Sequence, residues 1–315
     1  MQKYMPEGMN LHTPENRAYL SSAAGLERAM ANGAILESVA LLCDGDLRLH
    51  FDLGGIEGIL PREEAVLCRP GEVLKDIAVL TRVGKPVCFR VCALGQENGR
   101  DVAYLSRREA QRECIRNRLG DLIPGDVLRV RVTHLESFGA FADVGCGVSA
   151  LLPVDALSVS RIAHPRDRLT CGSVVWAVIR SVDASTGRFF LSMKELLGTW
   201  AENAAQFEVG QTVAGVIRSV EPYGVFVELA PNLAGLCELR QDLPPETLHP
   251  GDSAAVYIKS ILPERMKIKL ILIDTSSARV EPQPPRFFLD GDTTPHIDRW
   301  IYSPPESQRT VETVF

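Results

Sequence analysis

The sequence predicts an all-β protein built from a repeated, strand-rich unit with short helices between the copies. Apolar side chains alternate along several segments, as in residues 174–178, which is typical of half-buried strands. Glycines punctuate the ends of these segments as turn residues. The unit also recurs at a constant spacing, because Gly125 and Gly210 are 85 positions apart and so are Phe138 and Tyr223. Two landmarks at one offset indicate an internal repeat.

Residues 1–31 are predicted to form an N-terminal helical segment, with a helix over 13–31. Thr13 can cap this helix, and Pro14 occupies its first position, where a missing N–H costs nothing. Apolar side chains recur at helical spacing at Tyr19, Leu20, Ala23, Leu26 and Met30. Such a stripe is typical of a helix that packs against a core, here that of the first repeat.

The central copy, residues 120–194, is the best defined. Phe138 and Phe141 flank Gly139, and a glycine there suits a bulge or bend that lets the two rings share a face. A later strand is predicted to alternate through Val174, Trp176 and Val178.

This copy resembles the S-one-type RNA-binding repeat, named after the largest small-subunit ribosomal protein of bacteria. The matching positions are Gly125, Val130, Phe138-Gly139-Ala140-Phe141, Leu151-Leu152, Arg161-Ile162, His164-Pro165, Gly172, Val182-Asp183, Arg188 and Leu191-Ser192. In that family the repeat is a five-stranded OB-type barrel. The resemblance therefore implies three tandem five-stranded OB-fold barrels, joined by short helices.

The other two copies match less completely. Residues 32–106 resemble a degenerate first copy, in which 58–61 parallel 150–153 but the Phe-Gly-x-Phe element is absent. We do not expect this copy to hold bases, and the resemblance implies a docking role for it. Residues 208–275 form the third copy, in which Tyr223 and Phe226 repeat the aromatic pair.

Two connectors are predicted to be helical. Residues 107–119 carry five arginines against two glutamates, which indicates either a solvated linker helix or a strut that contacts phosphates. Residues 195–207 place Leu196, Leu197, Trp200 and Ala204 at helical spacing. We expect Trp200 to staple two barrels.

The last segment, residues 276–315, begins as a Pro-rich linker. Residues 296–302 and 309–315 are strand-like, with a Ser/Pro-rich turn between them. This pattern predicts a C-terminal β-hairpin.

Composition excludes several classes of function. No apolar run is long enough to cross a membrane, and the N-terminus has no apolar core typical of a secretory signal. The eight cysteines form no Cys-x-x-Cys pair, which favours free thiols in a reducing cytoplasm over zinc or disulfides. No nucleophile elbow, phosphate-binding loop or metal-ligand cluster is present. We therefore expect a cytoplasmic protein that is no enzyme and needs no cofactor, metal or membrane.

OB-type surfaces hold single strands by stacking bases on aromatic rings inside a basic groove. We expect Phe138 and Phe141 to form this platform, with Tyr223 and Phe226 as its counterpart in the third copy. Ordinary barrel core is the alternative for each ring. The duplicated aromatic-Gly-x-Phe arrangement favours the platform.

Polar and charged residues are expected beside these rings. The candidates are His134, Arg129, Arg131, Arg161, His164, Asp183 and Arg188 in the central copy, with Lys267 in the third. The resemblance implies that Arg188 meets phosphate and that Asp183 orients its neighbours. A structural histidine is the alternative for His164, and a turn ion pair is the alternative for Asp183 with Arg188.

Three departures from the family weaken the expected affinity. A histidine that follows the Gly-Leu-x element in many such repeats is replaced by Pro61, Pro153 and Glu238. The third copy has Leu262 where the aspartate is expected. The net charge of −6 also predicts weak, salt-sensitive contact with RNA.

The resemblance implies a protein that binds single-stranded RNA in translation, as a short form of ribosomal protein S-one that brings mRNA to the small ribosomal subunit. One alternative is an RNA-binding accessory of a decay or transcription complex. Another is a protein-interaction scaffold whose barrels have lost RNA binding.

Overall fold

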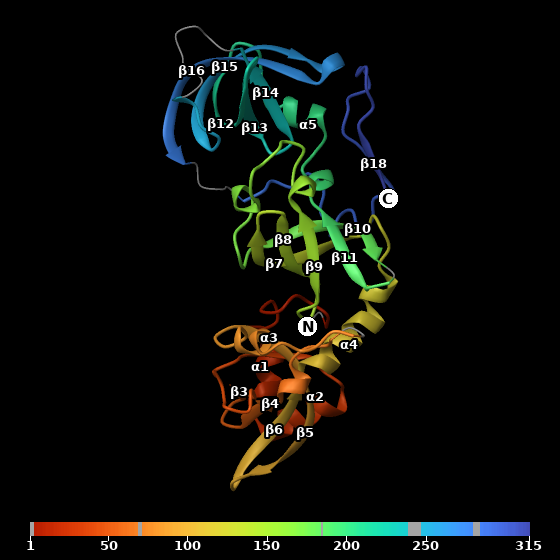
Figure 1. The fold of residues 1–315 in the computed structure, drawn as a ribbon. Coiled ribbons are helices and arrows are strands. Elements are labelled where there is room, and N and C mark those ends of the chain that lie inside the picture. Colours follow the sequence, from red (N-terminus) through yellow and green to blue (C-terminus); the bar gives the residue numbers. More distant parts are fainter. Residues whose placement is uncertain (1–2, 69–70, 184, 239–246, 280–283) are drawn as a thin grey trace. The chain divides into compact units, whose positions relative to one another are not determined.

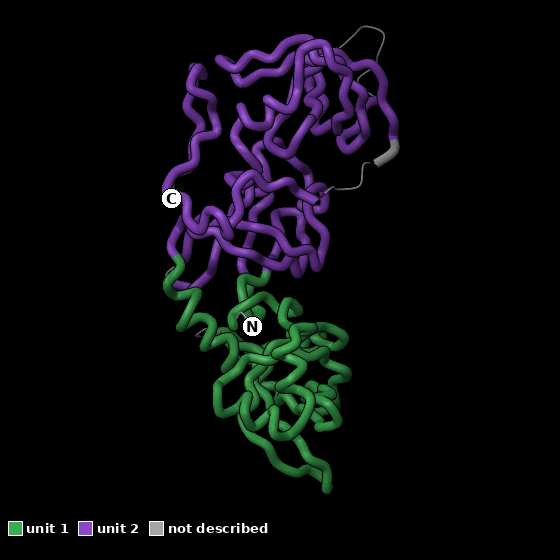
Figure 2. The backbone as a smooth tube through the Cα atoms, turned by 180° about the vertical axis from the view of Figure 1, so that it is seen from behind, with its two compact units in different colours: residues 1–122, 143–149 green, residues 123–142, 150–315 purple. Residues whose placement is uncertain are grey.

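The computed structural model describes residues 3–68, 71–183, 185–238, 247–279 and 284–315. The chain divides into two compact units, one made of residues 1–122 with 143–149 and the other of 123–142 with 150–315 (Figure 2). None of the described helices is long and apolar enough to cross a membrane.

The helix predicted over 13–31 is interrupted near its middle, giving α1 (Pro14–Leu20) and α2 (Ala23–Ala31). Thr13 caps α1 as predicted, since its side chain accepts a hydrogen bond from the Asn16 N–H. The break occurs because Ser22 takes an extended conformation and caps α2 by accepting from the Gly25 N–H. A Cβ at Gly25 would lie 2.3 Å from the Tyr19 carbonyl oxygen, so only glycine lets the helices approach this closely.

The first repeat is a six-stranded sheet in the order β1-β5-β6-β4-β3-β2. Figure 1 labels β3, β4, β5 and β6 of this sheet. Its first strand is split: the Ala40 N–H donates to the Lys85 carbonyl, whereas the Leu41 N–H donates to His50. The chain thus changes partner between these two residues. The elements are β1 (Leu36–Val39), β2 (Leu42–Cys43), β3 (Leu49–Asp52), β4 (Glu57–Leu60), η1 (Arg62–Glu64), α3 (Asp76–Leu80), β5 (Pro86–Glu97) and β6 (Arg100–Ser106).

The second and third copies are closed five-stranded barrels with the same strand order, which confirms the predicted fold class. The second barrel contains β7 (Val127–Glu136), β8 (Gly139–Asp143), β9 (Ser149–Pro153), β10 (Val174–Asp183) and β11 (Arg188–Ser192). The third contains β12 (Thr212–Glu221), β13 (Gly224–Ala230), β14 (Leu233–Cys237), β15 (Asp252–Leu262) and β16 (Lys267–Arg279). Short 3₁₀ turns η3 (Val154–Ala156) and η4 (Pro165–Asp167) lie between β9 and β10.

The predicted inward face of β10 is wrong for two residues. Val174 and Trp176 point outward, and Val175 and Ala177 enter the core instead. The alternation misleads here because both faces of this strand are apolar. The outer face needs apolar residues because Trp176 is covered: the Arg129 guanidinium lies 4.6 Å from its ring centroid, and Gly291 packs against it.

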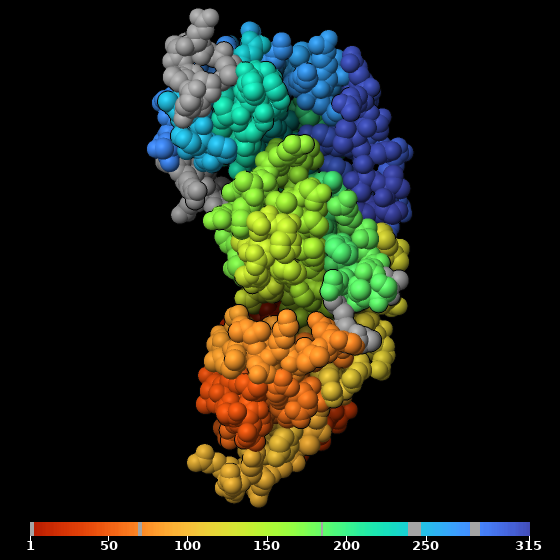
Figure 3. All heavy atoms as spheres, in the orientation of Figure 1, coloured from red at the N-terminus to blue at the C-terminus, as the bar shows by residue number. Residues whose placement is uncertain are grey.

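Two further elements hold the second unit together. A short helix, α5 (Trp200–Ala204), follows η5 (Lys194–Leu196) and buries Trp200 in a core that also contains Val178 and Ile217. Trp200 thus belongs to a core cluster with residues from both barrels, as expected of a residue that joins them. The predicted hairpin is also present: β17 (Arg299–Ile301) pairs with β18 (Glu312–Val314), beside the third barrel (Figure 3).

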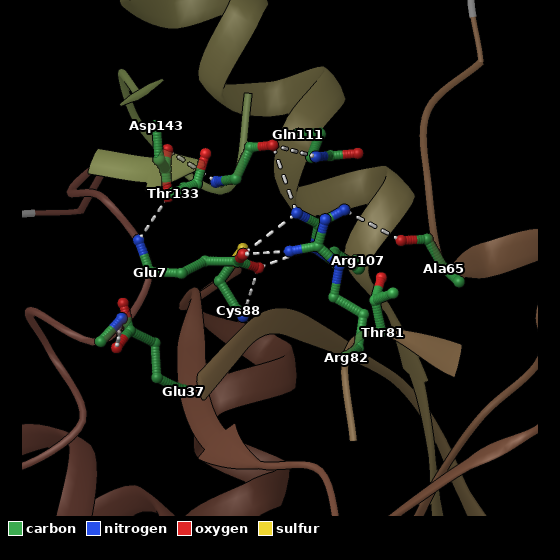
Figure 4. Close-up of polar contacts among 12 residues, drawn as sticks. Glu7, Glu37, Ala65, Thr81, Arg82, Cys88, Arg107, Gln111, Thr133 and Asp143 are labelled. Carbon is green, nitrogen blue, oxygen red and sulfur yellow. Dashed lines mark hydrogen bonds and ion pairs between the residues drawn. The ribbon is translucent and has the colours of Figure 1, made fainter. Parts of the chain in front are cut away.

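The basic connector forms α4 (Arg107–Asn117), followed by η2 (Leu119–Asp121). Its first arginine is neither solvated nor free to contact phosphate, because Arg107 is 1% exposed and forms an ion pair with Glu7 (Figure 4). Arg108 and Arg112 likewise pair with Glu64 and Glu109. Both interpretations of this helix are therefore wrong for Arg107.

Candidate nucleic-acid interface

The second barrel presents an aromatic cluster at the turn between β7 and β8. Phe138 is 54% exposed, and its ring centroid lies 6.0 Å from that of half-buried Phe141 in an edge-to-face arrangement of 87°. The His134 ring stacks near Phe141, with centroids 6.5 Å apart and planes 27° apart. The structure thus brings these three predicted residues together on the outside of the barrel.

The close approach of β8 to β9 places these rings. A Cβ at Gly139 would lie 2.6 Å from the Leu152 carbonyl oxygen, so the position demands glycine. The Val154 N–H donates to the Phe138 carbonyl at 3.0 Å, and continuing this antiparallel ladder by three residues sets Phe141 opposite Leu151. Phe138 itself belongs to the turn, so its odd spacing from Phe141 does not put it on the opposite face.

Arg188 begins β11 as an exposed residue opposite Asp183 on β10. The predicted ion pair between them is not formed. Hydrogen bonds from the side chains of Thr186 and Ser185 instead hold the pKa of Asp183 below its usual range. Within the described ranges Arg188 has no ion-pair partner, which leaves its guanidinium available to a phosphate.

Other predicted cations lie apart from the rings. Arg129 is five residues from His134 along β7, about 16 Å at the usual rise of a strand. It forms an ion pair with Asp292 at 2.6 Å and lies over Trp176, where residues 284–315 pack. Arg131 is half-buried beside Val174 on the same side. Arg129 therefore stabilises the packing of the C-terminal segment.

The loop between β9 and β10 carries the remaining two candidates. His164 is the N-cap of η4, because its Nδ1 accepts from the Arg166 N–H at 3.1 Å. This contact supports the structural role that the sequence left open. Arg161 is exposed in the same loop, and its contact with RNA stays a prediction.

The third barrel repeats the aromatic arrangement. Tyr223 is 64% exposed, and its ring lies 6.2 Å from that of half-buried Phe226 at 88°. Lys267 is exposed and opposite Leu262, the relationship that Arg188 has to Asp183. The third barrel therefore has a cation at the position equivalent to Arg188 but a leucine at the position equivalent to Asp183.

In the first repeat a network of paired acidic and basic side chains lies at the turn where the other copies carry rings. Asp44 accepts hydrogen bonds from Arg48 and His50. Pro61, Pro153 and Glu238 all stand at the end of the third strand of their copy or directly after it. Among the described residues of this copy no Phe, Tyr or Trp ring is exposed, and that it holds no bases stays a prediction.

Four outward-facing residues on the fourth and fifth strands of the two barrels were not predicted as site residues from the sequence: Phe190, Arg180, Lys259 and Lys269. Arg180 and Lys259 each sit in a β-bulge, between Ile179 and Ser181 and between Ile258 and Ser260. The signal was present, because Ile-Arg-Ser at 179–181 recurs as Ile-Lys-Ser at 258–260. Among the described side chains, no group of three His, Cys, Asp or Glu residues is placed to hold a metal ion.

Comparison with known families assigns this barrel. Residues 121–194 match the model of the S1 RNA binding domain. The second barrel is an S1 domain. The chain is also homologous to the small ribosomal subunit protein bS1 of bacteria. It is 30% identical over 236 residues to bS1 of Staphylococcus aureus and 32% identical over 233 residues to that of Leuconostoc lactis.

Each alignment includes 70% of this chain, and the chain spans only 59% and 52% of the length of these two relatives. A solved multidomain protein with nucleic acid binding domains from Streptococcus pneumoniae is 14% identical, with 79% of this chain and 76% of that one covered. Its TM-score is 0.24, which is no evidence of a shared architecture. The homology to bS1 therefore rests on sequence, and residues 121–194 also match a family model.

Proposed function

We propose that this protein binds single-stranded RNA through the S1 domain and the third barrel. The observation that carries the proposal is the repeated pair of edge-to-face rings, Phe138 with Phe141 and Tyr223 with Phe226. In each pair the first ring is more than half exposed. An exposed aromatic ring suits a stacked base, and each barrel also carries an exposed cation, Arg188 or Lys267, that suits a phosphate.

The chemistry predicts weak and sequence-tolerant binding at each barrel. Stacking of a base on an aromatic ring contributes about 1–3 kcal/mol and accepts any base. The net charge of −6 opposes the approach of RNA, so the local cations must outweigh it and affinity must fall with salt. Two such sites on one chain gain from effective concentration.

Likeness to bS1 supports a finer role, in which the protein binds mRNA in the cytoplasm and associates with the small ribosomal subunit during translation. The first repeat, which lacks the rings, would dock to a partner. An accessory of an RNA decay or transcription complex uses the same surface and is the second candidate.

Binding of a labelled oligouridylate to the full chain at low and moderate salt tests the proposal. We expect measurable binding at low salt that weakens as salt rises. No binding at low salt contradicts the proposal and favours a protein-interaction scaffold. Co-sedimentation with small ribosomal subunits, against co-purification with a nuclease, separates the two RNA-binding roles.

A further inference from the structure

The S1 domain and the third barrel differ at one outward position of the fifth strand. Phe190 on β11 lies opposite Leu151 of β9, and Lys269 on β16 lies opposite Leu236 of β14. Both residues also face a serine on the fourth strand, Ser181 and Ser260. The two positions are therefore equivalent, and an aromatic ring in one barrel corresponds to an ammonium group in the other.

Phe190 continues the ring-bearing face of the S1 domain. Phe141, Leu151 and Phe190 occupy neighbouring strands in one row, and each is half-buried between core residues of its own strand. Two strand spacings separate Phe141 from Phe190, about 10 Å. The Leu151 side chain lies between the two rings in this row, so the three side chains form one continuous outward strip on which bases can stack.

The barrel core does not account for the ring of Phe190. Its neighbours Phe189 and Leu191 are 5% and 0% exposed and fill the interior, whereas Phe190 lies on the outer surface. Two exposed arginines accompany it: Arg188 two residues before it on β11, and Arg180 in the bulge beside Ser181. A surface ring between guanidinium groups suits a stacked nucleotide.

The third barrel has a different composition at the same place. Lys267 and Lys269 alternate with buried Ile268 and Leu270, so both lysines point outward. Lys259, in the bulge next to Ser260, is exposed as well. In the described part of the chain, none of these three lysines has an ion-pair partner. Beyond its two rings, this face offers three ammonium groups.

We propose that the two barrels hold RNA by different means, and this inference rests on the proposed function. Phe190 adds a third stacking ring to the S1 domain, so that this barrel binds mainly through bases. Lys269, flanked by Lys259 and Lys267, makes the third barrel bind mainly through phosphates. The residue at this one position decides between the two modes.

Titration of the full chain with labelled oligouridylate over a series of salt concentrations tests the inference. Phe190→Leu keeps an apolar side chain but removes the ring, so affinity should fall about five- to 150-fold at every salt concentration. The slope of log affinity against log salt should not change. Phe190→Tyr, which keeps the ring, should bind like the unmodified chain and shows that the barrel tolerates substitution there.

Lys269→Met should change the salt dependence of binding, which Phe190→Leu leaves unaltered. It removes one phosphate contact, so the magnitude of the salt slope should fall by about 0.7, as expected for single strands. In the double variant with Phe190→Lys and Lys269→Phe, the S1 domain should carry the additional phosphate contact and the third barrel the additional stacking ring.

Unchanged affinity in Phe190→Leu, or an unchanged salt slope in Lys269→Met, would overturn the division of labour. These failures differ from failure of the proposed function. If the unmodified chain binds and Phe138→Ala weakens it while Phe190→Leu does not, RNA binding stands and only this inference is lost. If the unmodified chain does not bind, the function itself is lost.

Discussion

Arg107 and Glu7 form a buried, bidentate ion pair although they are 100 residues apart in the sequence. The Arg107 Nε lies 2.6 Å from Glu7 Oε1, and Nη2 lies 3.0 Å from Oε2 (Figure 4). Burial disfavours a charged carboxylate, yet the Arg107 guanidinium lowers the pKa of Glu7. Glu7 also accepts from the Cys88 N–H. The pair ties the N-terminal segment to α4 and β5.

Glu7→Ala should destabilise the first unit by about 3–5 kcal/mol, because it leaves the Arg107 charge buried without its partner. Urea unfolding of the full chain measures the change. Asp76→Asn is the matched control, because it breaks the exposed Arg62–Asp76 ion pair and should cost no more than about 1 kcal/mol. Equal effects of the two substitutions would show that the buried pair contributes no more than a surface one.

Stability of the first unit should fall as pH rises from about 5 to about 8. Burial raises the pKa of Glu37 from 4.5 to about 8, and the nearby Glu7 and Asp143 carboxylates add to the shift. The folded state therefore binds a proton that the unfolded state has released over this range, and stability declines with pH. The Gly8 and Asn10 N–H groups both donate to Oε2, which leaves Oε1 to carry the proton.

Glu37→Gln provides the check, since an amide keeps the shape of the protonated acid and does not titrate. Thermal unfolding at pH 5, 6.5 and 8 should show a decline in the unmodified chain that is flatter in the variant. A decline of the same steepness in both chains would mean that another group is responsible.

Phe138→Ala should weaken RNA binding by about 1–3 kcal/mol and leave the barrel folded. The ring is 54% exposed, so little packing is lost. Phe89→Ala is the contrasting substitution in the first repeat, where a ring that is 0% exposed should cost about 3–5 kcal/mol of stability. Circular dichroism and RNA titration measure the two effects, and unfolding of Phe138→Ala would assign that ring to the core.

Glu228→Ala should loosen the connection between the S1 domain and the third barrel. Glu228 accepts from Arg218 at 2.9 and 3.0 Å and also pairs with Arg168, which is 6% exposed. Removing a buried partner of this kind costs about 3–5 kcal/mol. The amide of Ser160, which donates to the Pro231 carbonyl, should exchange hydrogen faster. Unchanged exchange there would show that the network does not hold the two barrels.

Much of the architecture follows from local patterns. The aromatic-Gly-x-Phe element placed Phe138 beside Phe141, because a tight turn and a glycine leave the rings few other positions. Thr13 capped its helix, and the two strand-like ends of the last segment paired. Each of these features depends on residues close in sequence, so the repeat and its exposed rings could be predicted from the sequence alone.

Long-range packing decided the rest. No local pattern relates Arg107 to Glu7. The five arginines of residues 107–119 indicate a solvated or phosphate-binding helix, and only the distant Glu7 carboxylate explains why Arg107 is buried. Both faces of β10 carry apolar residues, so the sequence alone does not tell which face points outward. The C-terminal segment that packs over Trp176 identifies the outer face. The parallel pairing of β11 with β9 is what places Phe190 opposite Leu151, in line with Phe141. The sequence determined the repeated barrels and their rings. Only tertiary contacts decided which charged side chains are buried or paired and which stay exposed on the surface.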